Sequence, residues 1–426
     1  MFRKPTEIER LYIDFDCFFA SVEQQCDTKL QNQPVGVLPF MSEASCVIAA
    51  SHEAKHYGVK TGTRVKEARK RCPHIKFVPA RHDVYVHLYQ KIYQTIEDCI
   101  HIDQACSIDE VVCTLLGNER RQAQQLAQQI KQRLAKVIGP YITCSIGFAP
   151  NRLLAKTAAE VDKPDGMVIW RPEEFAEKLF ELKLNDIPGI GKGMSERLKR
   201  ADINDVRKLY TLPPERMRKI WNSIEGERFW YSLHGYAVEP IPTSRRMFGH
   251  SRILTPENRI ADKARLCARL LTVKAARRLR RAGFLASKFY LSIRIEHPVK
   301  KIKWSAETNF TAAADDHTFL TALSELWLGA LWENQQYKIN NMLRIKQVSI
   351  SLYGLTTLRE QQADLFAQQD PLKHEKQRWH TIAETMDEIV KRYGAKAASL
   401  GIWEEPPGGY AGAKIAFGRI PNLADF

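Results

Sequence analysis

Three acidic side chains in two short motifs have the types and spacing that metal-dependent phosphoryl chemistry requires. Asp14 lies in the mostly apolar run Leu11–Asp16, and the adjacent pair Asp109 and Glu110 opens a second apolar run. Joining a hydroxyl oxygen to a phosphate uses two divalent cations about 4 Å apart, one activating the attacking oxygen and one holding the phosphates. Cations of the Mg²⁺ type prefer carboxylate and carbonyl oxygens. The sequence therefore offers a donor set for such a site.

The two motifs can converge only if strands carry them to one edge of a sheet. Apolar side chains alternate along Leu11–Asp16, which predicts a strand with Asp14 on its exposed face. The run Val111–Leu116 predicts a second strand, entered through Asp109 and Glu110. A single aspartate is more often an unrelated surface acid, and that interpretation stays open for these residues taken alone.

The segments around these strands alternate between helical and strand-like periodicity. The order strand, helix, strand, helix, strand predicts an α+β sheet domain, with the compact segment 27–80 inserted as a lobe after the first helix. Helical spacing covers 18–25, 84–100, 122–137 and 151–161, and strand alternation covers 142–148.

A second region, 175–238, is predicted to be all-helical. At its centre Pro188–Gly191 interrupts the helical pattern and predicts a hairpin between two helices. Two prolines in 239–244 resist helix formation, so this segment is predicted to be a linker.

The last part of the chain predicts another α+β domain and a tail. The tail, 357–426, is polar and later rich in Gly and Pro, so we expect it to be flexible. The domain, 245–356, has helical spacing at 260–281 and 318–332 and strand alternation at 289–295 and 348–352.

Positive charge is concentrated in one part of the chain. There are 64 Lys and Arg against 49 Asp and Glu, a net charge of +15. Between Arg245 and Lys303, 17 basic residues face only three acids. A solvated helix face explains a short run of this kind, but a segment of this size repels itself unless an anion lies against it. A nucleic-acid backbone is the partner this favours, with Arg245 and Arg246 as candidate contacts.

Cysteine usage and hydropathy bear on the compartment. The nine cysteines include no C-x-x-C pair, which indicates free thiols in a reducing environment. The N-terminus has no signal-peptide apolar stretch, and no apolar run is long enough to cross a bilayer. We expect a cytoplasmic, nucleoid-associated protein with no membrane contact.

Five motifs in order resemble those of the Y-family DNA polymerases. The resemblance is detailed from Leu11 to about Arg200 and looser as far as Leu355. It implies template-directed DNA synthesis across damaged templates, with low fidelity and no proofreading nuclease. The motifs are Tyr12–Glu23, His52–Lys60, Ser107–Glu110, Ala155–Gly166 and Ile187–Gly191.

The resemblance also implies the names of the domains. They are a palm (1–26 and 81–174) with a βαββαβ-type sheet, fingers (27–80), a helix–hairpin–helix thumb (175–238) and a little finger (245–356).

The resemblance assigns a catalytic centre residue by residue. Asp14, Asp109 and Glu110 are implied to hold two Mg²⁺ ions, together with the Phe15 carbonyl. A deoxynucleoside triphosphate is implied to contact the backbone amides at the start of a helix, whose N–H groups favour anions, and several side chains. These nucleotide-binding residues are Cys17, Phe18, Phe19, His52, Lys55 and Lys163.

Phe19 matches the steric gate of the family, an aromatic ring in the space that a ribose 2′-hydroxyl needs. We expect Phe18 to be an ordinary core residue. Many members, notably those similar to DNA polymerase IV, have Tyr and Arg where this chain has His52 and Lys55. Lys55 keeps the charge without bidentate geometry. The subfamily, polymerase IV-like or UmuC-like, stays open.

The hairpin and the basic domain predict a sequence-independent grip on primer–template DNA by a monomer. Gly189 and Gly191 let backbone N–H groups approach a phosphate with no Cβ in the way. A plain helix turn is the alternative for the hairpin alone. Beside the basic domain, a duplex grip is favoured, and its affinity should fall steeply with salt.

A short peptide in the tail resembles the bacterial sliding-clamp motif. In Gln362-Ala363-Asp364-Leu365-Phe366 the glutamine would form hydrogen bonds and Leu365 and Phe366 would fill an apolar pocket. The resemblance implies a sliding clamp as partner, through Gln362, Leu365 and Phe366.

Two other functions are compatible with parts of the pattern. A catalytically inactive DNA- and clamp-binding scaffold would recruit another polymerase, but inactive relatives usually lose their acids. A nucleotide cyclase could use the same carboxylates, but it would not need the hairpin or the basic domain. The lesion preference, the regulatory partners and the role of 406–426 have no sequence prediction.

Overall fold

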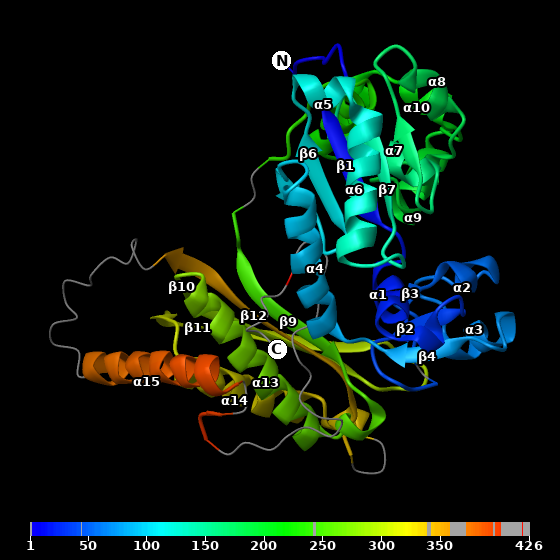
Figure 1. The fold of residues 1–426 in the computed structure, drawn as a ribbon. Coiled ribbons are helices and arrows are strands. Elements are labelled where there is room, and N and C mark those ends of the chain that lie inside the picture. Colours follow the sequence, from blue (N-terminus) through cyan, green and yellow to red (C-terminus); the bar gives the residue numbers. More distant parts are fainter. Residues whose placement is uncertain are drawn as a thin grey trace. The chain divides into compact units, whose positions relative to one another are not determined.

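The computed structural model describes residues 2–43, 45–241, 244–338, 342–357, 372–394, 397–401 and 420 (Figure 1). The chain divides into two compact units, with the boundary after Ile241, inside the segment 239–244. Both units mix helices with β-sheet, so the predicted α+β multidomain class is confirmed. Among the described residues, no helix combines the length and apolar character needed to span a bilayer.

The first unit is built on a five-stranded sheet of order β5-β6-β1-β7-β8. Its central strand β1 is antiparallel to both β6 and β7, and β8 runs parallel to β7. The strands are β1 (Arg10–Phe15), β5 (Gln104–Ala105), β6 (Glu110–Thr114), β7 (Cys144–Ala149) and β8 (Met167–Ile169).

Helices cover this sheet and bury β1. Figure 1 shows α4 and α6 close together over the sheet, while Tyr12 of β1 packs in a core with α7. Leu11 and Ile13, whose side chains alternate with that of Tyr12, are also fully buried. The helices are α1 (Phe18–Cys26), α4 (His82–Glu97), α5 (Gly117–Arg121), α6 (Ala123–Val137) and α7 (Arg152–Val161).

Helix α7 lies unusually close to the sheet. It begins at Asn151, whose side chain accepts a hydrogen bond from the Leu154 amide at 2.9 Å. A Cβ atom at Gly147 of β7 would lie 2.1 Å from the carbonyl oxygen of Ala155. Glycine is therefore needed there for α7 to reach the sheet, and this contact fixes the side chains that α7 presents.

The segment between α1 and α4 folds around a small sheet of order β3-β2-β4 with its own apolar core. Helix α2 begins at Ser51, whose side chain accepts a hydrogen bond from the Ala54 amide. The elements are η1 (Thr28–Leu30), β2 (Val35–Leu38), β3 (Ala49–Ala50), α2 (His52–His56), α3 (Val65–Arg71) and β4 (Lys76–Pro79).

The stretch after β8 is helical, as predicted. Its apolar side chains share one core with α7, which ties these helices to the five-stranded sheet. The elements are α8 (Phe175–Phe180), η2 (Leu184–Asp186), α9 (Lys192–Arg200), α10 (Val206–Tyr210), α11 (Pro214–Trp221) and α12 (Ile224–Leu233).

The second unit is a four-stranded antiparallel sheet of order β11-β10-β12-β9, with α13 and α14 packed against its core. Strands β9 and β11 were not predicted from the sequence. The elements are β9 (Met247–Ile253), η3 (Pro256–Asn258), α13 (Ala261–Arg281), β10 (Phe284–Ile295), β11 (Ile302–Ala313), α14 (Asp316–Glu333), η4 (Gln335–Tyr337) and β12 (Ile345–Thr357).

The region after β12 contains a helix that the sequence analysis did not predict, α15 (Leu372–Tyr393). Its Trp379 ring stacks on His317 of α14, with centroids 4.1 Å apart. Asp387 accepts two hydrogen bonds from the Arg280 guanidinium, at 2.7 and 2.8 Å. These contacts hold α15 on α13 and α14.

Candidate active site

The strand register brings the two acidic motifs together. Asp14 lies directly opposite Glu110 in the β1–β6 pairing. The Phe15 amide donates a hydrogen bond to the Asp109 carbonyl at 2.8 Å. Acids that are about 95 residues apart in the sequence therefore meet at one edge of the sheet.

All three acids line one cavity of about 430 Å³. The cavity brings together most of the residues that were assigned to catalysis and nucleotide binding, and the segment 27–80 supplies one wall. From the assigned set it contains Asp14, Phe15, Cys17, Phe18, Phe19, Lys55, Asp109, Glu110 and Lys163. Lining residues that were not predicted are Ile48, Ala49, Ala50, Thr61, Ser107 and Ile108.

The prediction that Asp14 lies on an exposed face is wrong. Its residue is only 8% exposed, because β1 is covered on both faces. The Lys163 ammonium lies 2.6 Å from one Asp14 oxygen and 2.9 Å from Glu160. The Asp14 carboxylate is thus a buried charge with a paired cation rather than a surface acid.

The other two carboxylates are also held by neighbours. Lys156 of α7 forms an ion pair with Glu110. The Ser107 hydroxyl donates to Asp109 at 2.5 Å. Lys156 lies in one of the sequence motifs but was not predicted as a site residue. No local pattern marks its role, because its partner Glu110 is 46 positions away in the sequence.

Burial is the largest single influence on the pKa of each of the three acids. It raises the pKa of Asp14 to about 8 against the opposing effect of Lys163, and it raises the pKa of Asp109. Burial also acts to raise the pKa of Glu110, but the hydrogen bond and charge of Lys156, together with hydrogen bonds to Tyr12 and Asp14, outweigh it and that pKa is lowered. Three crowded carboxylates in a buried site need added positive charge to stay ionised together.

The donor set fits a hard divalent cation, although a rearrangement is required. The three acids offer carboxylate oxygens, which Mg²⁺ prefers. In the part of the chain that the structure describes, no three His, Cys, Asp or Glu side chains form a ready-made ligand cluster. Lys163 and Lys156 each contact one oxygen, of Asp14 and Glu110 respectively, so the carboxylates can act as ligands through their other oxygens once the three acids converge.

Asp16 belongs to the fold rather than to the cavity. Its carboxylate accepts hydrogen bonds from Ser145 at 2.9 Å, Thr143 at 3.1 Å and the Asp165 amide at 2.9 Å. It is 2% exposed. These bonds tie the end of β1 to β7 and to the loop before β8.

The start of α1 forms the other side of the cavity. Cys17, its N-cap residue, has a left-handed backbone (φ 51°) and makes no side-chain cap hydrogen bond. The first-turn N–H groups of a helix have no intrahelical acceptor. Both Phe18 and Phe19 line the cavity, but Phe18 is only 3% exposed and is a core residue, whereas Phe19 is half-buried.

His52 and Lys55 lie at different distances from the cavity. Lys55 lines it, but His52 does not. The Nδ1 atom of His52 lies 3.7 Å from Cys17 Sγ, and burial lowers the pKa of the imidazole. Its Nε2 atom is buried and has no hydrogen-bond partner among the described residues.

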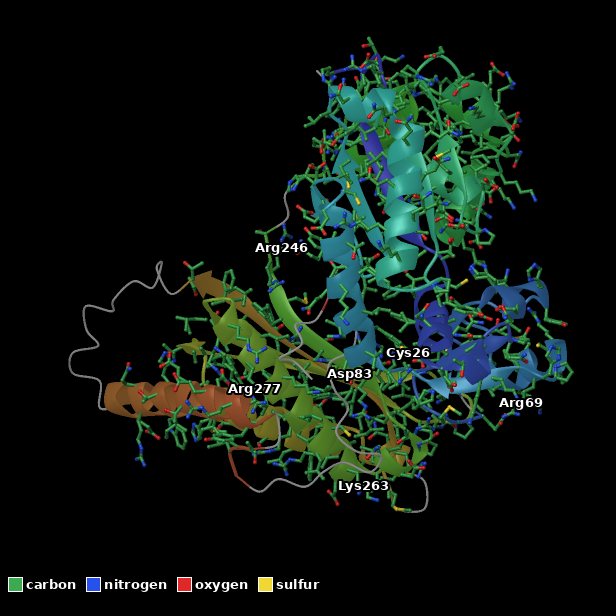
Figure 2. The ribbon with its side chains drawn as sticks, in the orientation of Figure 1. Cys26, Arg69, Asp83, Arg246, Lys263 and Arg277 are labelled. Atoms are coloured by element: carbon green, nitrogen blue, oxygen red, sulfur yellow. The ribbon has the colours of Figure 1, made fainter. Side chains whose placement is uncertain are left out.

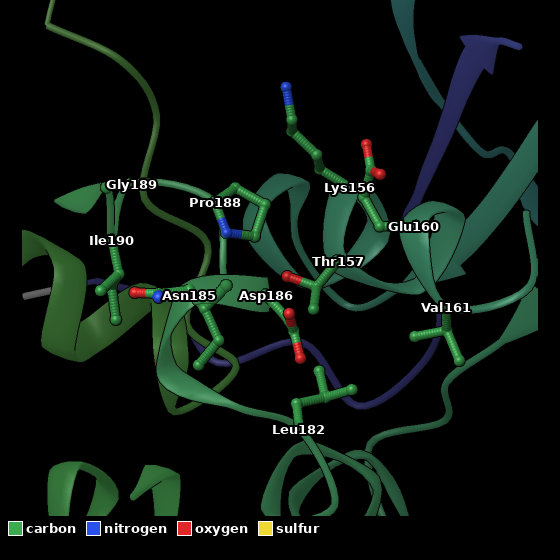
Figure 3. A pocket seen from close by; sticks show the side chains of 12 residues that line it. Lys156, Thr157, Glu160, Val161, Leu182, Asn185, Asp186, Pro188, Gly189 and Ile190 are labelled. Carbon is green, nitrogen blue, oxygen red and sulfur yellow. The ribbon is translucent and has the colours of Figure 1, made fainter. Parts of the chain in front are cut away.

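A second cavity, of about 560 Å³, lies between α7 and the hairpin (Figure 3). Lys156 and Glu160 line it from α7, and 187–191 line it from the hairpin. Gly189 has φ +95°, which a side chain would strain. A Cβ atom at Gly191 would meet nothing within 4 Å, so this side of the hairpin is open to a partner.

The basic residues of the second unit fall into two groups. Arg245 and Arg246 are exposed just before β9, where Figure 2 labels Arg246. The Arg245 guanidinium lies 4.8 Å from the centre of the Phe248 ring. Arg280, in contrast, is buried and pairs with Asp316, and Arg277 is 9% exposed. The sequence analysis overlooked these internal pairs, because the partner acids lie outside the basic segment. Gln362, Leu365 and Phe366 lie outside the described residues.

Carboxylates at the edge of an α+β sheet, an adjoining cavity and a glycine hairpin define a nucleotide-transferring class of enzyme. Residues 13–160 match the model of the impB/mucB/samB family. The chain is 30% identical to a DNA polymerase IV of Moorella thermoacetica over 91% of this chain and 94% of the relative. It is 26% identical to a DNA polymerase IV 1 of Bacillus subtilis, over 92% of each chain.

A solved structure of a Y-family DNA polymerase chimera has the same fold, with a TM-score of 0.67 at 23% identity. The match covers 82% of this chain and 99% of that one. The chain belongs to the Y-family of DNA-directed DNA polymerases.

Proposed function

We propose that this protein copies damaged DNA templates by two-metal nucleotidyl transfer, as a monomer and without proofreading. The observation that carries the proposal is the 430 Å³ cavity, which joins the buried Asp14 and the half-buried Asp109 and Glu110 to an aromatic ring and two lysines. The inactive-scaffold alternative has no observation in its favour, because all three acids line this cavity.

The cavity residues that were assigned from the sequence have separate roles in this proposal. Asp14, Asp109, Glu110 and the Phe15 carbonyl would hold two Mg²⁺ ions. When bound, these ions would activate the attacking hydroxyl and neutralise the triphosphate. Lys163 and Lys55 would then pair with phosphate oxygens as point charges, and the amides at the start of α1 would donate to them. Phe19 would exclude a ribose 2′-hydroxyl.

DNA would be held through its backbone. The hairpin glycines Gly189 and Gly191 would donate N–H groups to a phosphate, and Arg245 and Arg246 would add charge contacts. A sliding clamp would bind Gln362, Leu365 and Phe366. The domain names given above, palm, fingers, thumb and little finger, are part of the same proposal.

Primer extension on undamaged and lesion-containing templates, with and without Mg²⁺, tests the proposal. Wild-type protein is expected to extend primers only with the metal. Asp109→Ala should slow extension at least about a thousand-fold, since it removes a ligand used in the transition state. Glu173→Ala, at an exposed acid outside the cavity, is the matched control and should behave as wild type.

Binding to primer–template DNA separates the catalytic part of the proposal from the DNA-binding part. Asp109→Ala should bind DNA as wild type does, whereas Arg245→Ala/Arg246→Ala should bind about tenfold less tightly and with a flatter salt dependence. An Asp109→Ala protein that still extends primers at the wild-type rate would contradict the mechanism.

A further inference from the structure

Four polar and aromatic side chains that do not line the cavity form a cluster with Phe19, which does. Phe19 and Glu23 are one turn apart on α1, so their side chains lie on the same side of that helix. This side meets the first turns of α4, where Arg81, His82 and Tyr85 lie (Figure 1). We call these five residues the gate cluster.

The Phe19 ring is held by two other rings. It stacks on Tyr85 with centroids 4.5 Å apart and planes inclined by 13°. His82 meets it edge-on, at 6.0 Å and 89°. Both arrangements are favoured for aromatic pairs. The Tyr85 ring therefore sets how far Phe19 can tilt away from the cavity.

Tyr85 is itself fixed by a buried charge. It is fully buried, and its hydroxyl donates to Glu23 Oε1 at 2.6 Å. Arg81 donates to the same carboxylate from Nε at 3.1 Å and from Nη2 at 2.6 Å. Glu23 is 3% exposed, so its charge is compensated almost wholly by these two donors. Moving Tyr85 would leave part of a buried charge without a partner.

We propose that Tyr85, anchored by Glu23, is a positioning residue for sugar discrimination. It keeps the Phe19 ring pressed toward the nucleotide, so that a ribose 2′-hydroxyl meets the ring rather than displacing it. This rests on the proposed function, because it assumes that Phe19 meets the sugar. The inference goes beyond that function, because it makes the degree of discrimination against ribonucleotides depend on Tyr85, which does not line the cavity.

A purely structural role for Tyr85 makes a different prediction. If it were only core, its loss would lower stability and would affect both kinds of nucleotide alike. If it positions Phe19, its loss should favour ribonucleotides selectively, mainly through their KM, and only while Phe19 is present. Two variants separate the two interactions of Tyr85. Tyr85→Phe keeps the ring stack on Phe19 and loses the hydrogen bond to Glu23, and Tyr85→Leu loses both.

The experiment is steady-state insertion of dCTP or CTP opposite a template guanine. Phe19→Ala is expected to lower the kcat/KM preference for dCTP at least about tenfold, because an interaction that excludes one substrate is lost. Tyr85→Leu should lower it about three- to tenfold, and Tyr85→Phe by less. The double variant Phe19→Ala/Tyr85→Leu should lose no more of the preference for dCTP than Phe19→Ala alone, because the effects of residues that act through one another are not additive.

Tyr93→Leu is the matched control, since Tyr93 lies two turns further along α4 and pairs with Tyr89 instead. It should leave the sugar preference unchanged. Unchanged preference in a folded Tyr85→Leu, or an additive loss in the double variant, overturns the proposal. If Tyr85→Leu does not fold, unchanged preference in Tyr85→Phe overturns it. If the wild-type protein inserts neither nucleotide, the proposed function is wrong, and this inference is wrong with it.

Discussion

At the scale of single residues, His52 shows how burial sets the charge of a nucleotide-binding candidate. Burial lowers the pKa of its imidazole, so the folded protein favours the neutral form. An unfolded histidine titrates near pH 6.5, and the unfolded chain therefore takes up this proton first as the pH falls. The folded protein is therefore destabilised by this group as the pH falls below about 6.5.

His52→Gln should remove that contribution. Comparing melting temperatures at pH 7.5 and pH 5.5, we expect the variant to lose less on acidification than the wild type. The difference between the two proteins isolates His52 from the other titrating groups. Parallel pH profiles for the two proteins would rule out a lowered pKa at this position.

The types and approximate places of the proposed catalytic residues could be predicted from the sequence, but their partners could not. Asp14, Asp109 and Glu110 were marked by motifs, and the strand register does bring them together. The ion pairs to Lys163 and Lys156 join residues 149 and 46 positions apart. Such pairs depend on how α7 and its following loop lie on the sheet, which local patterns do not encode.

At the scale of elements, the same limit appears in the second unit. Helices α13 and α14 were predicted because their apolar residues recur at helical spacing. Strand β11 was missed although Ile302, Trp304 and Phe310 alternate with exposed polar residues, because its inward positions also include small or polar side chains. Strand β9 pairs only with β12, and its sequence alone does not show that partner.

Helix α15 was missed because the tail was judged by its polar composition, although Trp379, Ile382 and Met386 recur at helical spacing. Its attachment rests on the Arg280–Asp387 pair, where Arg280 also bonds Asp316 at 2.9 Å. Asp387→Ala should therefore lower the free energy of unfolding by about 2 kcal/mol, since hydrogen bonds to a charged, largely buried group are lost. Amide hydrogens of α15 should exchange faster than in the wild type.

Chemical denaturation and hydrogen exchange measure the two effects. Glu388→Ala is the control, because Glu388 is the exposed neighbour of Asp387 on the same helix. Exchange in α15 that is unchanged by Asp387→Ala would show that other contacts, such as the Trp379–His317 stack, hold the helix alone.

At the scale of the whole molecule, the two units carry different features. The first unit holds the acids, the cavity and the hairpin, and the second holds most of the excess positive charge. Arg259 and Arg280 form ion pairs with Glu296 and Asp316 inside this unit. The remaining exposed basic residues are those available to a DNA backbone, so affinity should depend on fewer contacts than the net charge suggests.

The proposed contact with a sliding clamp falls in the segment between β12 and α15. This segment begins after Thr357 and ends before Leu372, so both of its ends are anchored to the second unit. The clamp-like peptide with Leu365 and Phe366 lies in this segment. A tether raises the effective concentration of a weakly binding polymerase at the primer end without altering its chemistry.

Leu365→Ala/Phe366→Ala should therefore abolish the stimulation of synthesis by a sliding clamp loaded on DNA, because the apolar side chains that fill the clamp pocket are gone. Distributive synthesis without the clamp should stay within about twofold of the wild type, since no catalytic contact changes. Product lengths on a long primed template, with and without clamp, measure both effects. Gln368→Ala, in the same segment but outside the peptide, is the control. Equal stimulation of wild type and double variant would mean that the clamp, if it binds this protein at all, uses another surface.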